Sequence, residues 1–127
     1  MITYNSDKEF AALKNKKLRL LKEKRDQACI EGIVFQSHIF DVRDKTTNNI
    51  ALKRSCYKDR AHKFKFADKD HRILDLQNET KFEEFHQAIF ERKDYIMFHY
   101  NELYSTITDA TTKEEIESIV IDFTQPE

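Results

Sequence analysis

The chain has 127 residues, which is enough for one modest hydrophobic core and too few for two. Its 35% of charged residues are accompanied by ten Phe and five Tyr, so the composition excludes a disordered chain. One Gly and one Pro are too few for the many turns of a β-sandwich or barrel. We therefore expect a single domain over residues 1–127 with an α+β fold that is mainly helical.

Neither a membrane segment nor a secretory signal is expected. No apolar run approaches the roughly 18 residues that cross a membrane, and MITYNSDKEF lacks a basic flank followed by an apolar core. Cys29 and Cys56 have no metal or redox spacing, which favours free thiols in a reducing compartment over a bridge between them.

The net charge of −1 hides a strong polarity along the chain. Residues 1–25 carry eight Lys or Arg and three acids, whereas residues 109–127 carry one Lys and six acids. Such polarity can guide contact between the two ends, or with a charged partner. Two solvated helix faces are the plainer interpretation.

The first predicted element is a long helix over residues 6–31. Ser6 is expected at its N-cap, with Glu9 completing a capping box. Gly32, the only glycine, suits the left-handed position just beyond the helix.

This helix has a thin apolar stripe, because Lys17 and Lys24 interrupt it. The stripe consists of Phe10, Leu13, Leu20, Leu21 and Ala28. Such a narrow stripe suits a coiled-coil-like seam or a helix that packs along one side only.

Two short strands around Gln36-Ser37-His38 are predicted next, within residues 33–42. A helix over residues 47–62 follows; its candidate N-caps are Asp44, Thr46 and Thr47, and its inner positions are Ile50, Ala51, Cys56 and Tyr57. Residues 63–76 repeat the strand–turn–strand pattern. Since isolated hairpins are marginally stable, the two must pair into one small sheet or pack on the helices.

The clearest helical pattern covers residues 78–107, with Asn78 or Thr80 as its cap. Its core stripe is expected to contain Phe82, Phe85, Ile89, Ile96 and Leu103, with Phe35 and Phe40 packed nearby and a second stripe of Phe90, Met97 and Tyr104 beside it.

A short final helix is predicted after this long one. Thr112 stands three residues before Glu115, which is a second capping box. The apolar residues of this helix are Ile116, Ile119 and Val120.

The order of these features resembles an uncharacterised domain family found in bacteriophage and prophage tail and tail-fibre assembly proteins. The resemblance covers about residues 18–121. It is carried by KEKRD before the glycine, GIVF and IFDVRDKTTNNI after it, then FKFAD, AIFERKD and ITDATTKEEIESI. Family members often carry Trp and Gly around the second hairpin, where this chain has Phe64, Phe66 and Lys69.

The resemblance implies a tail-associated protein that acts through protein–protein contacts. It would be a tail-fibre assembly factor (chaperone) or a small fibre-associated component, located in the cytoplasm of the bacterial host during assembly or on the virion tail. The partner would be a tail-fibre or other tail protein, with a homo-oligomer as the alternative. The candidate interaction residues are Phe10, Leu13, Lys17, Leu20, Lys24, Phe35 and Phe40.

An enzyme is not expected, because no nucleophile motif occurs in the chain. Glu83 and His86 have the Glu-x-x-His spacing of di-metal bundles, but a second such pair is missing. Four aspartates, Asp41, Asp44, Asp68 and Asp70, stand where turns and helix caps favour Asp. No cofactor or metal is therefore expected.

The alternative hypothesis is a small nucleic-acid-binding or host-modulating phage protein that uses the basic first helix. Its cations wind around the helix instead of lining one side: Lys14, Lys16, Lys17, Arg19, Lys22, Lys24 and Arg25. A nucleic-acid reader usually has a clear basic excess, which this chain lacks. The aromatic residues Tyr95, Phe98, Tyr100 and Tyr104 are interpreted as core, not as a base-stacking platform.

Overall fold

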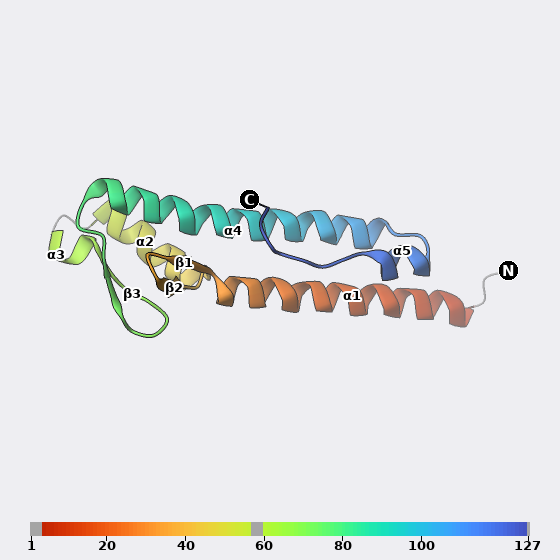
Figure 1. The fold of residues 1–127 in the computed structure, drawn as a ribbon. Helices are drawn as coiled ribbons and strands as arrows, with labels where there is room; N and C mark the ends of the chain where they lie inside the picture. Colours follow the sequence, from red (N-terminus) through yellow and green to blue (C-terminus); the bar gives the residue numbers. More distant parts are fainter. Residues whose placement is uncertain (1–3, 57–59, 127) are drawn as a thin grey trace. The chain divides into compact units, whose positions relative to one another are not determined.

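The mainly helical α+β class is confirmed by a computed structural model, which describes residues 4–56 and 60–126. Figure 1 shows the elements in chain order: α1 (Tyr4–Glu31), β1 (Ile33–Phe35), β2 (His38–Phe40), α2 (Asp44–Cys56), α3 (Arg60–Lys63), β3 (Lys65–Ala67), β4 (Ile73–Asp75), α4 (Glu79–Asp109) and α5 (Lys113–Ser118). Within the described ranges, no helix is both long enough and apolar enough to cross a membrane.

The chain forms two compact units, and the helices α1 and α4 each contribute to both. The helical unit contains the chain up to Gln27 and from Ile96 onward. The hairpin unit contains Ala28–Tyr95, and therefore both pairs of strands.

In the helical unit, α1 and α4 run antiparallel. Lys14 Nζ donates to the carbonyl oxygen of Thr108 at 2.5 Å, near the end of α4. Further along α1, the Arg25 guanidinium lies over the Tyr100 ring, 4.5 Å from its centroid. The apolar stems of these long polar side chains thus cover part of the contact between α1 and α4. The fully or largely buried apolar residues of this unit are Leu21, Ile96, Leu103, Ile107, Ala110, Ile116 and Phe123.

The hairpin unit holds two separate two-stranded antiparallel sheets. Phe35 pairs with His38 across the first hairpin, and Phe66 pairs with Leu74 across the second. A backbone hydrogen bond of 2.9 Å joins the hairpins, from the Lys69 N–H to the Ile39 carbonyl. The sequence left two arrangements open, one shared sheet or two hairpins packed on the helices. Since the two sheets are separate, the second arrangement is the one found.

Aromatic rings attach both hairpins to α4. Phe35 and Phe40 meet the Phe85 ring edge-on, with centroids 5.2 and 4.9 Å away. Phe64 and Phe66 meet the Phe82 ring in the same way, at 5.9 and 5.6 Å. The core stripe predicted on α4 is confirmed, because Phe82, Phe85, Ile89, Ile96 and Leu103 are all buried.

The end of α1 is closed by three different segments. Gly32 has a φ of +62°, as predicted, and its N–H donates to the Ala28 carbonyl at 3.0 Å. The Val42 N–H donates to the Cys29 carbonyl, and Lys69 Nζ donates to the Ile30 carbonyl, both at 2.8 Å. Three carbonyls that the helix itself leaves without partners are thereby satisfied.

Two predicted helix starts are wrong. Helix α1 begins at Tyr4, so Ser6 lies inside its first turn instead of at the N-cap. Helix α2 begins at Asp44, so Thr46 and Thr47 also lie inside the helix. The reason is Asp41, whose carboxylate accepts hydrogen bonds from the Arg43 N–H and the Thr46 hydroxyl and fixes the start of α2.

The predicted second helix, over residues 47–62, corresponds to α2 and the start of α3, with residues 57–59 outside the described ranges. Helix α2 ends at Cys56, and α3 begins at Arg60. Its inner position Ile50 is buried, as predicted. Tyr57 lies outside the described residues.

Two other predicted caps are confirmed. The Asn78 side chain accepts a hydrogen bond from the Lys81 N–H at 2.9 Å, which starts α4. The Thr112 hydroxyl accepts one from the Glu115 N–H at 3.1 Å, and the Glu115 carboxylate accepts the Thr111 N–H at 2.8 Å. This reciprocal capping starts α5.

The interpretation of the aromatic residues on the second half of α4 as core is wrong for two of them. Phe98 is 69% exposed and Tyr104 is 45% exposed. The reason is that this half of α4 carries aromatic residues on several faces, whereas α1 packs along one side. Val120 is exposed as well, because α5 ends at Ser118.

Gly32→Ala tests the closure of α1. A Cβ atom at Gly32 would lie 1.8 Å from the Phe40 carbonyl oxygen and 2.6 Å from the Asp41 Cα, both of them backbone atoms. We expect Gly32→Ala to lower the free energy of unfolding, measured by urea denaturation, by more than the ~1 kcal/mol that replacing a glycine of positive φ typically costs. Asn15→Ala, on the exposed side of α1, is the control. Equal midpoints for the two variants would contradict this account.

Substitutions in the first hairpin turn, at Gln36 and Ser37, should instead stabilise the fold. Gln36 and Ser37 have φ angles of +48° and +67°, which is the two-residue type I′ turn that favours Asn-Gly. Combining Gln36→Asn with Ser37→Gly should raise the free energy of unfolding by about 0.5–1 kcal/mol, because Asn and Gly adopt a positive φ at a lower cost than Gln and Ser. A lower thermal midpoint would show that these side chains have a role that the turn does not explain.

Candidate functional site: a groove between α1 and α5

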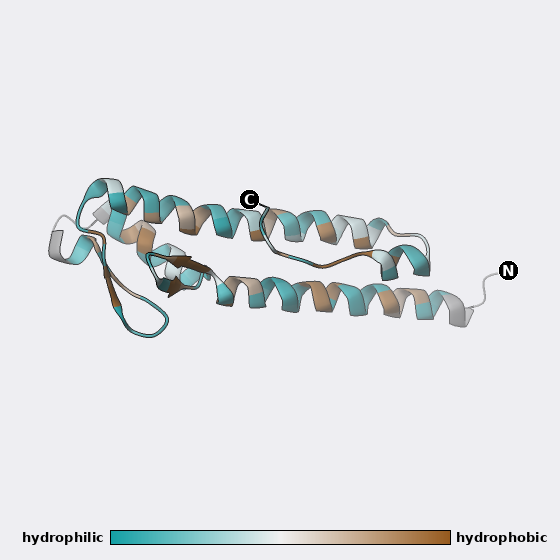
Figure 2. Ribbon diagram, in the orientation of Figure 1, coloured by the Kyte–Doolittle hydropathy of each residue, from teal (hydrophilic) through white to brown (hydrophobic). Residues whose placement is uncertain are grey.

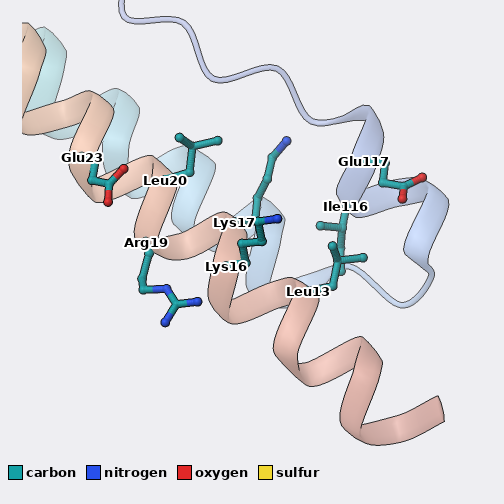
Figure 3. A pocket seen from close by; sticks show the side chains of 8 residues that line it. All are labelled: Leu13, Lys16, Lys17, Arg19, Leu20, Glu23, Ile116 and Glu117. Carbon is teal, nitrogen blue, oxygen red and sulfur yellow. The ribbon is translucent and has the colours of Figure 1, made fainter. Parts of the chain in front are cut away.

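A groove of about 430 Å³ lies between α1 and α5 within the helical unit. Figure 3 shows its side chains: Leu13, Lys16, Lys17, Arg19, Leu20 and Glu23 come from α1, and Ile116 and Glu117 come from α5. A second hollow, of about 400 Å³, adjoins it at Leu13 and is also lined by Glu9, Phe10 and Lys113. We call the two together the α1–α5 groove.

The floor of the groove is apolar. Leu13 and Leu20 are seven residues apart and lie on one side of α1. Leu13 and Ile116 point toward one another in Figure 3, and Ile116 is fully buried. Leu20 remains 40% exposed, so the floor is open to an additional apolar side chain.

The wall that α1 provides is cationic. Lys16, Lys17 and Arg19 all stand between the two leucines in the sequence, and two acids of α1, Glu9 and Glu23, line the groove with them. Figure 2 shows α1 as mainly hydrophilic with separate hydrophobic positions, which matches this alternation. The α5 side of the groove carries one acid, Glu117, and one base, Lys113.

Capping positions α5 beside α1. Since Thr112 and Glu115 fix the first turn, Ile116 is held on the side of this short helix that faces Leu13. The oppositely charged ends of the chain therefore belong to one unit, which is the first of the two contacts that the charge polarity suggested.

The groove unites four of the predicted interaction residues: Phe10, Leu13, Lys17 and Leu20. Lys24 is exposed on α1 but does not line the groove. Phe40 is buried against Phe85, as predicted for a residue packed near the core stripe of α4, and it lies outside the groove. Phe35 packs on the same ring and is half-buried, so it belongs to the core as well.

Sequence reasoning missed the contribution of α5. The sequence predicts Ile116 as an apolar position of the final helix without a partner on α1, and Lys16 and Arg19 among the cations that could bind phosphates or guide a charged partner. The charge polarity of the two ends was the signal that could have paired these elements.

The hairpin unit contains a more polar cavity, of about 650 Å³. It is lined by Asp41, Arg43, Lys45, Thr46, Asn49, Ile50, Phe66, Ala67, Asp68, Lys69 and His71. The two carboxylates are engaged in holding the backbone. Burial raises the pKa of Asp41, but hydrogen bonds from Thr46 and Arg43 outweigh it and lower the pKa overall.

Asp68 holds the second hairpin turn. Its side chain is 1% exposed and accepts the N–H groups of Asp70 and Arg72 at 2.8 and 2.9 Å. His38 Nδ1 lies 2.7 Å from the other carboxylate oxygen. This His–Asp pair therefore ties the two hairpins together.

The Glu83–His86 pair does not form a metal centre. Arg54 engages both Glu83 oxygens, at 2.8 and 2.9 Å. Burial and the Arg54 charge lower the pKa of His86, whose ring stacks on Phe90 with centroids 4.4 Å apart. In the described part of the chain, no three His, Cys, Asp or Glu residues are grouped so as to hold a metal ion.

A comparison with protein families places most of the chain in one of them. Its match extends over residues 12–125. The chain belongs to the family described as a domain of unknown function (DUF4376). The matched region contains the lining residues of the α1–α5 groove from Leu13 to Glu117, whereas Glu9 and Phe10 precede it. No curated protein and no solved structure matches the chain.

Asp68→Asn tests the tie between the hairpins. Burial raises the pKa of Asp68, but the hydrogen bonds from Arg72, His38 and Asp70 hold it below the usual 3.8. The ionised carboxylate therefore stabilises the fold at neutral pH, and this contribution is lost as the pH falls through and below about 4.

The difference in urea midpoint between the wild type and Asp68→Asn should accordingly be largest near pH 7 and shrink toward pH 3. Asp70→Asn removes an exposed carboxylate from the same turn and controls for the change in net charge. A difference that stays constant with pH would rule out the ionised Asp68 as the source of the stabilisation.

Proposed function

We propose that the chain is a non-enzymatic bacteriophage or prophage tail-associated protein that acts as an assembly factor for a tail fibre. The order of motifs over about residues 18–121, described above, supports the association with tails. The protein acts through contacts with the fibre protein during assembly in the bacterial host.

The observation that carries a protein-contact role is the open α1–α5 groove. It combines an apolar floor with a cationic wall, which is the combination that supplies contact area and guides the approach of a charged partner. Leu20, at 40% exposure, is the apolar side chain most available to such a partner among those that line the groove.

The polar residues that could serve an enzyme are instead engaged in holding the fold. The His38–Asp68 pair and the carboxylate of Asp41 hold turns and a helix start, and Glu83 is paired with Arg54. The basic residues of α1 are also divided in their roles: Lys14 caps α4, whereas Lys16, Lys17 and Arg19 border an apolar floor. That division favours a protein partner over a phosphate backbone.

Leu20→Glu tests the proposal in co-expression with a bacteriophage tail-fibre protein. The wild type should co-purify with the fibre protein and increase its soluble yield, and Leu20→Glu should lose both effects because a carboxylate replaces apolar contact area. The matched control is Leu52→Glu, at a leucine of α2 that is 52% exposed and outside the groove.

Retention of both effects by Leu20→Glu, in a variant whose circular dichroism and melting match the wild type, would remove the groove from the proposal. An unchanged soluble yield of fibre protein with and without the wild-type chain would contradict the assembly role itself.

A further inference from the structure

We infer that the α1–α5 groove takes an amphipathic helix with an acidic edge, supplied by the partner protein. The inference rests on the proposed function, and it adds the chemistry of the segment that is bound. Three observations on the helical unit carry it: a segment already seated on α1, the charge of the α1 wall, and the length and backbone of the groove.

The chain itself shows what α1 accepts. Helix α5 is an acidic segment, with Glu114, Glu115 and Glu117 among its six residues, and it contacts the groove through Ile116. Its single buried isoleucine contributes to the same floor as Leu13. An acidic helix that inserts an aliphatic side chain between cations is therefore a mode of contact already present on α1.

Helix α5 leaves part of this surface open. It is six residues long, whereas the lining of the groove extends along α1 from Glu9 to Glu23. At 1.5 Å per helical residue this length is about 21 Å, which fits about 15 residues of a second helix. Phe10 at one end and Leu20 at the other would each receive an apolar side chain from it.

The charge of the wall selects the partner. Lys16, Lys17 and Arg19 border the floor on the α1 side, so an acidic edge there gains attraction and a basic edge is repelled. On the α5 side, the groove is lined by one acid, Glu117, and one base, Lys113. The edge of the partner helix that faces α5 can therefore carry either sign of charge.

The backbone of the groove favours a helix over an extended segment. Both walls are helices, whose main-chain groups bond within the helix and give an added strand no edge to pair with. A helix satisfies its own backbone and presents only side chains, which is how amphipathic helices bind in grooves.

The test uses three labelled helical peptides of about 15 residues, with leucines at identical positions of one face. Their remaining positions are rich in Glu, Gln or Lys. Fluorescence anisotropy with the full chain should show binding of the Glu peptide, about tenfold weaker binding of the Gln peptide and none of the Lys peptide. Added salt should weaken the Glu complex.

Two charge reversals on α1 locate the contact. Combining Lys16→Glu with Arg19→Glu should abolish binding of the Glu peptide and allow binding of the Lys peptide. Combining Lys22→Glu with Lys24→Glu changes the net charge by the same amount at exposed positions outside the groove, and should leave the preference for the Glu peptide in place.

The inference is overturned if the Glu peptide fails to bind at millimolar concentration or binds no better than the Lys peptide. It is also overturned if both double variants lose binding equally, or if an oligonucleotide or a second copy of the chain displaces the peptide from the groove. Any of these results, together with fibre capture that still depends on Leu20, would leave the proposed function intact and reject only the acidic helix.

Discussion

Both units depend on one requirement: the main-chain carbonyl groups at the ends of helices and in loops must accept hydrogen bonds. In a chain with one glycine, most of these groups cannot be satisfied by glycine-based caps, and lysines from distant segments donate to them instead. Lys14 donates to Thr108 at the end of α4, and Lys69 donates to Ile30 at the end of α1. Lys93 serves the Val42 carbonyl in the same way, at 2.8 Å. Each of these bonds joins residues that lie far apart in sequence.

The cations of α1 differ in what they contact. Lys14 and Arg25 face α4, one as a cap and the other stacked on Tyr100, so their charges are committed to the fold. Lys16, Lys17 and Arg19 instead border the floor that α1 shares with α5. Contacts with α4 therefore account for two of the cations of α1, and the groove accounts for three others. The acidic C-terminal region belongs to the same unit, which places both signs of charge around one apolar floor.

Local signals gave the parts of the fold that depend on neighbouring residues. The left-handed Gly32, the caps at Asn78 and Thr112, and the buried stripe from Phe82 to Leu103 all follow from spacing and residue type. The start of α2 could not be predicted in this way, because Asp41 competes for its first turn from outside the helix. Half of the groove was predictable, since Leu13, Lys17 and Leu20 share one face of α1. The other half comes from Ile116, about a hundred residues later in the sequence. The spacing of apolar residues in α1 cannot predict this contact, because it depends on a distant segment.

The central claim is our proposal that the α1–α5 groove is a docking surface. Hydrogen–deuterium exchange of the chain, alone and mixed with a tail-fibre protein as the proposed partner, tests it most directly. Our account predicts added protection of amides in α1 between Glu9 and Glu23 and in α5, with the hairpins around Phe35–Phe40 and Phe64–Ile73 unchanged. Protection confined to the hairpins, with α1 and α5 exchanging as they do in the chain alone, would contradict it.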